Sequence, residues 1–234
     1  MGVTGWLKRI ALCLCAALLI VVLVGAAIAL ARQGGALKPL QASGLAWDIW
    51  FLGWTFGALW SRPAIARPRL RDDLLHWTPT VVGFALLAEG SAIRIDDPHA
   101  ALWASPLWTL PPAASWACTG LVAAGLLFTV WARLSLGSLW SGSVSRKTDH
   151  IIIESGPYGL VRHPIYTGLI LAAFAMAVQI HMPANLFGAG LMSVGLWLKA
   201  RLEERFIAEQ LGREAYAAYK ARTPMLIPFL PPRH

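Results

Sequence analysis

The sequence predicts an all-α membrane protein with about six transmembrane helices, five being the alternative count. Of its 234 residues, 57% are hydrophobic and only 14% are charged, which is far more apolar than an average soluble domain. Several uncharged runs approach the roughly 20 residues that a helix needs to cross a bilayer. Lys and Arg gather in short segments between these runs, as is typical of loops beside membrane helices.

The first predicted span is Ile10–Ala31, which has no charged residue and directly follows Lys8 and Arg9. A cleaved signal peptide is the alternative, because Ala29-Leu30-Ala31 resembles a cleavage site. The run is longer than the roughly 7 to 15 apolar residues of a usual signal core, which favours a retained helix.

Five further runs predict the remaining spans, and the second and third of the six are short. The last two are joined by His181-Met182-Pro183, a turn so short that the two helices must form a tight hairpin. The predicted spans two to six are Ala46–Trp60, Trp77–Ile93, Ala113–Leu134, Ile165–Ile180 and Ala184–Lys199.

The basic residues predict the orientation. With six spans, 17 of the 20 Lys and Arg residues fall on the side of both termini and 3 on the other, so both termini are predicted to be cytoplasmic. The net charge of +8 therefore reflects basic loops and does not indicate a nucleic-acid partner. The three cysteines lie inside apolar runs without metal-ligand spacing, so no metal site is predicted.

A polar segment precedes the fifth span. Gly156-Pro157 and Gly159 favour turns, and Pro164 suits the first turn of the next helix, so Arg162 and His163 are predicted at a helix mouth. The N-H groups and dipole of that helix, with these two side chains, would hold a carboxylate or phosphate. The alternative is that Arg162 and His163 merely reach into the lipid headgroups.

A second polar segment, 199–219, continues from the sixth span as a helix with one apolar and one charged face. The pair Glu203-Glu204 lies near the predicted hydrocarbon boundary, where carboxylates need a cationic partner. That partner is either Lys199 or Arg201 on the same helix, or a cationic ligand.

Together the two segments resemble the isoprenylcysteine carboxyl methyltransferase and phospholipid methyltransferase family of integral membrane enzymes. Its Gly-Pro-Tyr-x-x-x-Arg-His-Pro-x-Tyr-x-Gly motif is followed, one helical hairpin later, by Glu-Glu and Gly-x-x-x-Tyr-x-x-Tyr. The matching residues are Gly156, Pro157, Tyr158, Arg162, His163, Pro164, Tyr166, Gly168, Glu203, Glu204, Gly212, Tyr216 and Tyr219. The resemblance covers about 136–231, so residues 111–234 are predicted as the catalytic region and 1–110 as N-terminal transmembrane helices of unknown role.

The resemblance implies S-adenosylmethionine as the cofactor, in a cytoplasmic pocket capped by the C-terminal amphipathic helix. It implies that Lys199 binds substrate, at a position where the prenylcysteine enzyme has arginine. The candidate catalytic residues are Arg162, His163 and Glu204. The implied cofactor-binding residues are His150, Ile151, Ile152, Ile153, Tyr158, His163, Pro164, Ile165, Tyr166 and Glu203.

The predicted function is methyl transfer to a lipophilic small molecule from the bilayer, foremost the carboxylate of an isoprenylcysteine-like substrate. A carboxylate nucleophile needs no general base. The alternatives are a phospholipid amine or small thiol as acceptor, an NADPH-dependent sterol-type reductase, and a non-catalytic membrane scaffold. Membrane lipids are the other expected partners.

Overall fold

A computed structural model describes residues 37–58, 70–89, 103, 105–137, 153–211 and 213–230. Within these ranges all regular structure is helical, which confirms the predicted class. The predicted first span, Ile10–Ala31, lies outside the described residues. The helices are α2 (Pro39–Ala58), α3 (Leu70–Glu89), α5 (Pro112–Leu136), α6 (Pro157–Leu160), α7 (Pro164–Ile180), α8 (Pro183–Leu211) and α9 (Arg213–Arg222).

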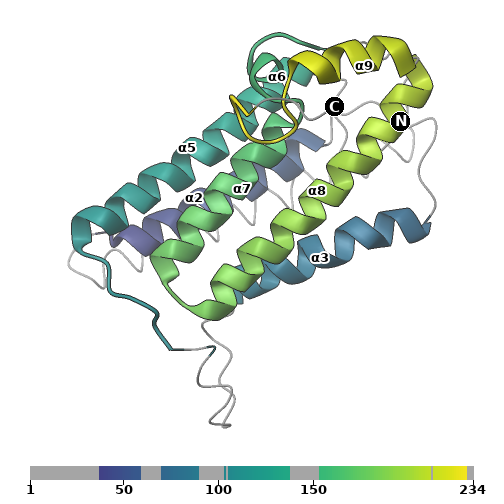
Figure 1. Ribbon diagram of the computed structural model, residues 1–234. Helices are drawn as coiled ribbons and strands as arrows, with labels where there is room; N and C mark the ends of the chain where they lie inside the picture. The colour runs from purple at the N-terminus through teal and green to yellow at the C-terminus, as the bar shows by residue number, and fades with distance from the viewer. Residues whose placement is uncertain are drawn as a thin grey trace, which may run out of the picture.

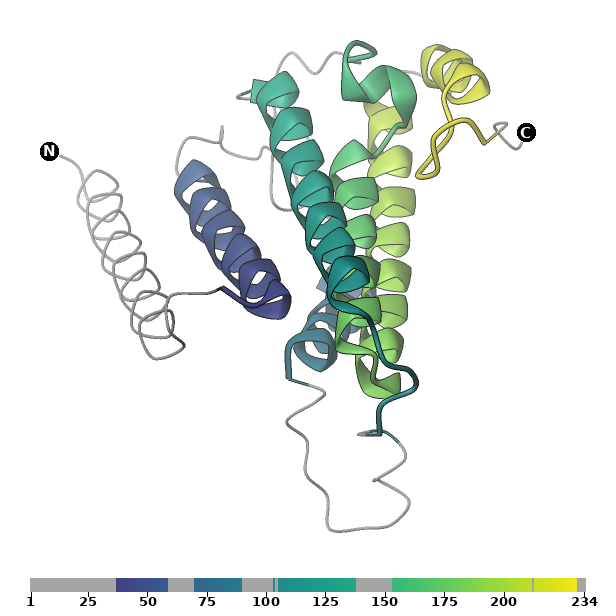
Figure 2. The same ribbon diagram turned by 90° about the vertical axis from the view of Figure 1, so that its left-hand side faces the viewer.

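Five long helices form a bundle in which α7 is central. Helix α7 packs between α5 and α8, α2 packs on α5, and α3 packs on α8 (Figure 1). Helices α6 and α9 lie together at one end of the bundle, and the α7–α8 turn lies at the opposite end (Figures 1 and 2). The motif residues of the α6–α7 turn are therefore at the same end as the last turns of α8.

The α7–α8 hairpin is confirmed. Pro164 and Pro183 occupy the first turns of the two helices, where the missing N-H costs nothing. His181 ends α7 in the left-handed conformation, at φ 58°, and its N-H bonds to Ala177 O. Helix α8 then runs without a break through 29 residues, so the predicted helical continuation beyond the sixth span is correct as far as Leu211. The rest of the predicted segment 199–219 belongs to a separate helix, α9, which begins at Arg213.

One described helix, α5, is long and apolar enough to cross a membrane, and α7 is a shorter apolar helix. Much of the α5 surface faces outward, including Leu127 and Leu134. Helices α2 and α3 both begin seven residues before the predicted spans. Hydropathy misses the start of α3 because this helix opens with the polar Asp72 and Asp73, whose negative charges suit a helix N-terminus.

Small residues allow α5 and α7 to approach closely. A methyl group on Gly125 of α5 would lie 2.5 Å from Gly168 O and 3.0 Å from Ala172 N, both on the α7 backbone. A methyl group on Gly168 would in turn collide with Gly125 O. Because Gly168 is about one turn from the start of α7 at Pro164, this contact fixes how the motif turn sits on the bundle.

We expect Gly125→Ala to destabilise the protein by about 1–3 kcal/mol, because the α7 backbone cannot move away without disturbing the bundle. Gly120→Ala is the matched control on the same helix, since nothing lies within 4 Å of its added methyl group. The control should be neutral or slightly stabilising through helix propensity. Thermal unfolding of both variants in detergent measures the difference, and equal melting temperatures would contradict the close contact.

Candidate active site

The turn between α6 and α7 is covered by the C-terminal segment. Gly156 takes φ 60° before α6, and Val161 is extended after it. The backbone N-H groups of Arg162 and His163 then donate to Pro224 O and Met225 O, at 2.9 and 3.1 Å. The turn and the chain beyond α9 therefore form one hydrogen-bonded unit, which the sequence did not predict in this detail.

Glu204 lies at the centre of a buried charge cluster. Its Oε1 accepts from Arg162 Nε at 2.7 Å and lies 3.2 Å from His163 Nε2, while its Oε2 lies 3.3 Å from Lys220 Nζ. Arg162 Nη1 also donates to Thr223 O. The two motifs thus meet directly, and Arg162 contacts a carboxylate from α8 together with a carbonyl of the C-terminal segment.

Glu203 has different neighbours and is more accessible. Its Oε1 accepts from Tyr166 OH at 2.6 Å, and its Oε2 lies 3.5 Å from His163 Nδ1. The rings of His163 and Tyr166 stack at 5.5 Å with an interplanar angle of 5°. The Glu203 side chain is 22% exposed against 7% for Glu204, so Glu203 is the carboxylate that a small molecule can reach.

The charges in this cluster are coupled. Burial favours the neutral imidazole of His163, but hydrogen bonds and negative charge from Glu203 and Glu204 outweigh it and raise the His163 pKa. Burial alone would raise the pKa of Glu204, but His163 and Arg162 lower it to about 2. The pKa of Glu203 is lowered against burial by His163 and Lys199. These shifts favour the anionic form of both carboxylates and the cationic form of His163.

Lys199 extends this cluster toward α3. Its Nζ lies over the rings of Trp77 and Tyr166, 5.2 and 5.5 Å from their centroids, and Glu203 and Asp73 are its negatively charged neighbours. The predicted alternative partner Arg201 instead lies over the Trp197 ring. Sequence reasoning found Lys199 but missed Trp77 and Asp73, because only the packing of α3 on α8 brings them here.

Helix α9 is bonded to α6 and to the residues just before it. Tyr219 OH donates to Tyr158 O at 2.8 Å, and Arg222 pairs with Glu154 at 2.7 Å. Lys220, which contacts Glu204, was not among the predicted site residues. A lysine directly after Tyr219 carries no signal of its own in a tail that holds several other basic residues.

The structure brings most of the predicted site residues to one end of the bundle. Tyr158, Pro164, Ile165 and Tyr166 are buried there, and Ile153 is partly buried against the same core. The predicted residues His150, Ile151 and Ile152 lie outside the described residues.

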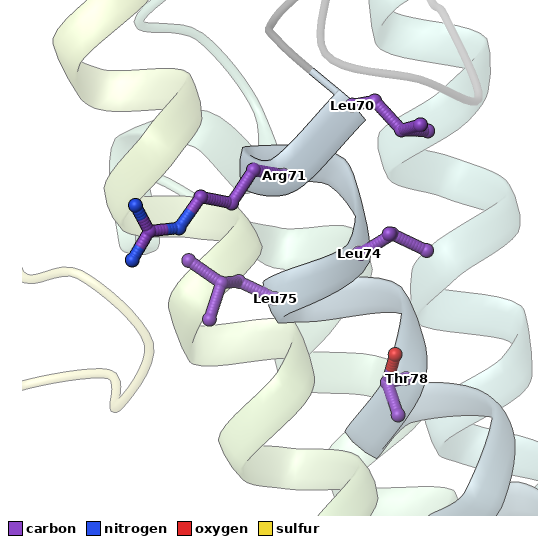
Figure 3. Close-up of a pocket in the computed structure, with 5 residues that line it drawn as sticks. All are labelled: Leu70, Arg71, Leu74, Leu75 and Thr78. Carbon is purple, nitrogen blue, oxygen red and sulfur yellow. The ribbon is translucent and has the colours of Figure 1, made fainter.

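Figure 3 shows a pocket lined by five residues, all on α3, and none of them is a predicted site residue. Arg71 and Leu75 point to one side of the helix in this view, and Leu70 and Leu74 to the other. The lining residues are Leu70, Arg71, Leu74, Leu75 and Thr78. This pocket lies on the apolar outer surface of α3, where Leu70, Leu74 and Leu75 are exposed.

Comparison with known proteins finds similarity in the part of the chain that holds the candidate site. A sequence model of the isoprenylcysteine carboxyl methyltransferase (ICMT) family matches residues 118–209. This region, which is less than half of the chain, is therefore similar to the ICMT family. The match runs from within α5 to near the end of α8, so it includes Arg162, His163, Glu203 and Glu204.

Three relatives of the ICMT-family region illustrate its range. The chain is 28% identical over 118 residues to a protein-S-isoprenylcysteine O-methyltransferase of Schizosaccharomyces pombe, covering 48% of each protein. It is 39% identical over 72 residues to methanethiol S-methyltransferase 1 of Bradyrhizobium diazoefficiens, covering 31% of this chain and 24% of the relative. It is 28% identical over 121 residues to the cobalt-zinc-cadmium resistance protein CzcN of Cupriavidus metallidurans, covering 50% and 53%.

The matches span about half the length of these relatives or less. They confirm the resemblance that the two motifs predicted, and the matched family and two of the three relatives are named as methyltransferases. The ICMT family consists of membrane proteins, in agreement with the apolar α5.

Proposed function

We propose that the chain transfers a methyl group from S-adenosylmethionine to a lipophilic acceptor that enters from the bilayer. The observation that carries this proposal is the direct meeting of the two family motifs around His163, with Glu203 accessible beside it. The finer proposal is that the acceptor group is the carboxylate of an isoprenylcysteine-like molecule.

The residues of the cluster suit this cofactor. When bound, S-adenosylmethionine supplies an electrophilic methyl group on a sulfonium. Glu203 offers an accessible negative charge, and the stacked rings of His163 and Tyr166 offer aromatic surface, both of which favour a cationic ligand. Glu203, Tyr158, Tyr166 and the chain around Ile153 would hold the cofactor, and Arg162 and Glu204 would position His163.

The charges of the cluster favour an acceptor that is already deprotonated. The two carboxylates raise the pKa of His163 and so favour its cationic form, and Glu204, whose pKa is about 2, is too weak a base to remove a proton near neutral pH. A carboxylate acceptor needs no base, because orientation supplies much of the catalysis of an in-line methyl transfer. Lys199, whose Nζ lies over the Tyr166 ring, is the cation that we propose beside the acceptor.

We further propose a six-span arrangement with both termini and the reaction site in the cytoplasm, supported by the bias of 17 basic residues against 3.

A small thiol is the second candidate acceptor. It is favoured by the region that is 39% identical to an enzyme named for methanethiol. A thiol would require a base to deprotonate it, and Glu204, whose pKa is about 2, is too weak for that role near neutral pH.

We expect purified protein in detergent to bind S-adenosylmethionine and not NADPH when each is titrated by calorimetry. Binding of NADPH alone would favour a sterol-type reductase, and binding of neither would favour a scaffold. Incubating native membranes with methyl-labelled cofactor should then label an extractable lipophilic product. Release of that label by mild alkali would identify a methyl ester and therefore a carboxylate acceptor.

A further inference from the structure

The chain beyond α9 runs along α7 after it leaves the reaction site. The backbone of the α6–α7 turn binds the carbonyls of Pro224 and Met225, as described above. The next residue, Leu226, accepts from Thr167 Oγ1 at 2.6 Å, about one turn inside α7. Figure 2 shows this segment (yellow) leaving α9 and dipping along the bundle before it turns back toward the C-terminus. Successive carbonyls therefore bond further along α7, and the segment descends beside that helix.

The length of α7 sets the level of this segment in the proposed membrane. Its 17 residues span about 26 Å, slightly less than the roughly 30 Å of the hydrocarbon core of a bilayer. The start of α7 at Pro164 must therefore lie near one hydrocarbon boundary if the α7–α8 turn is to reach the other. Because Leu226 bonds to Thr167, the residues after Leu226 lie at the depth where headgroups meet acyl chains.

Three apolar side chains are exposed at this depth. Ile227, Phe229 and Leu230 are 59%, 91% and 46% exposed, and Phe229 is more exposed than any other large hydrophobic residue that the structure describes. We call these three residues the apolar tip. The Leu230 N-H donates to Ile227 O, which closes the tip into a turn. Three such side chains on one turn form an apolar surface of the kind that contacts a membrane or another protein.

The backbone of the tip is strained at Phe229. Its φ is 64°, in the left-handed region that a bulky residue rarely adopts. The other non-glycine residue with positive φ in the described part of the chain is His181, whose N-H bonds to the last turn of α7. Because Phe229 is 91% exposed, packing within the described chain does not offset its strain. A contact outside the chain would offset it.

The surface next to the tip indicates which partner fits. Beyond Thr167, exposed positions recur on α7 at helical spacing as Leu171 and Phe174, and both are apolar. The tip therefore lies at the end of an exposed apolar stripe on α7. A bilayer would cover the stripe and the tip together, whereas a soluble partner would have to enter the membrane to contact the stripe.

We propose that the apolar tip inserts into the leaflet nearer to α6 and α9, at the boundary between headgroups and acyl chains, and so holds the C-terminal segment over the α6–α7 turn. Phe229 is the principal contact, because transfer of its side chain from water to lipid offsets the strain of its backbone. The tip is a membrane anchor and takes no part in methyl transfer. This inference goes beyond the proposed function and needs only the proposed membrane-spanning arrangement.

Spin labels test the depth of the tip directly. Full-length protein with its three cysteines replaced by alanine is labelled at Phe229→Cys and placed in lipid nanodiscs. Accessibility of the label to oxygen, which partitions into acyl chains, is compared with accessibility to a water-soluble nickel chelate. We expect the Phe229 label to favour oxygen, as a label at Leu127→Cys on the exposed face of α5 should. A label at Ala218→Cys, exposed on α9, should favour nickel.

The Phe229→Asn variant separates a lipid contact from backbone strain. Asn tolerates positive φ better than Phe, so relief of strain alone would stabilise the C-terminal segment, whereas loss of a lipid contact would destabilise it. We expect the amide hydrogens of Arg162 and His163, which bond to this segment, to exchange about tenfold faster in nanodiscs. Mass spectrometry measures the exchange. Phe229→Leu keeps an apolar side chain at the same position and should exchange nearly like the natural protein.

Preference of the Phe229 label for nickel, or unchanged or slower exchange in Phe229→Asn, would overturn the proposal. If the Leu127 label also favours nickel, the membrane-spanning arrangement fails with it. Protection of the Phe229 label from both reagents would indicate a protein contact, such as a second copy of the chain, and would also overturn lipid insertion. Methyl transfer is assayed separately, so its absence would refute the proposed function and leave the anchor in place.

Discussion

Replacing Glu204 with glutamine should lower the free energy of unfolding by about 3–5 kcal/mol, because it removes the anion that Arg162, His163 and Lys220 share. Arg162 and Glu204 are each only 7% exposed, so water cannot replace the lost charge. Thermal and denaturant unfolding in detergent measure the effect. Glu214→Gln, an exposed carboxylate on α9, is the control and should cost about 0.5 kcal/mol.

The same carboxylate should give the protein a specific acid sensitivity. Its pKa is about 2 in the folded chain against an ordinary value of 4.5, so its contribution to stability is complete above pH 4.5. That contribution is lost progressively as the pH falls from 4.5 toward 2. The difference in melting temperature between the natural protein and Glu204→Gln should therefore shrink across this range. A constant difference would mean that Glu204 is not paired as described.

The sequence allowed the α7–α8 hairpin and the meeting of the two motifs to be predicted, because both follow from local rules. Pro164 and Pro183 mark helix starts, and a turn of two or three residues forces the helices to lie side by side. With the hairpin formed, the start of α7 and the later turns of α8 must be near each other. His163 and Glu204 could therefore be predicted as neighbours.

The particular partners could not be predicted, because they depend on how distant segments pack. Glu204 pairs with Lys220, and Arg162 and His163 bond to the backbone at Pro224 and Met225, only because the chain after α8 turns back over the α6–α7 junction. No periodic pattern of apolar residues in the sequence predicts that reversal of the chain. The same holds for α3, whose Asp73 and Trp77 reach Lys199 through a glycine-mediated contact between helices.

The two neighbouring glutamates, Glu203 and Glu204, should have different functions. Glu203→Gln leaves the Arg162–Glu204–His163 contacts in place, and Tyr166 OH can still donate to the amide oxygen, so the variant should remain folded. It removes the accessible negative charge, however. Affinity for S-adenosylmethionine should therefore fall about 10- to 100-fold, the value of one charge-assisted hydrogen bond, and methyl transfer at a fixed cofactor concentration should fall with it.

Calorimetric titration of Glu203→Gln with S-adenosylmethionine, below the melting temperature of the variant, checks this result. Glu214→Gln serves again as the matched control and should bind like the natural protein. If Glu203→Gln keeps both cofactor affinity and methyl transfer, Glu203 is not the ligand of the cofactor. Its contacts with Tyr166 and His163 would then be structural, and the accessible carboxylate would no longer support the proposed cofactor site.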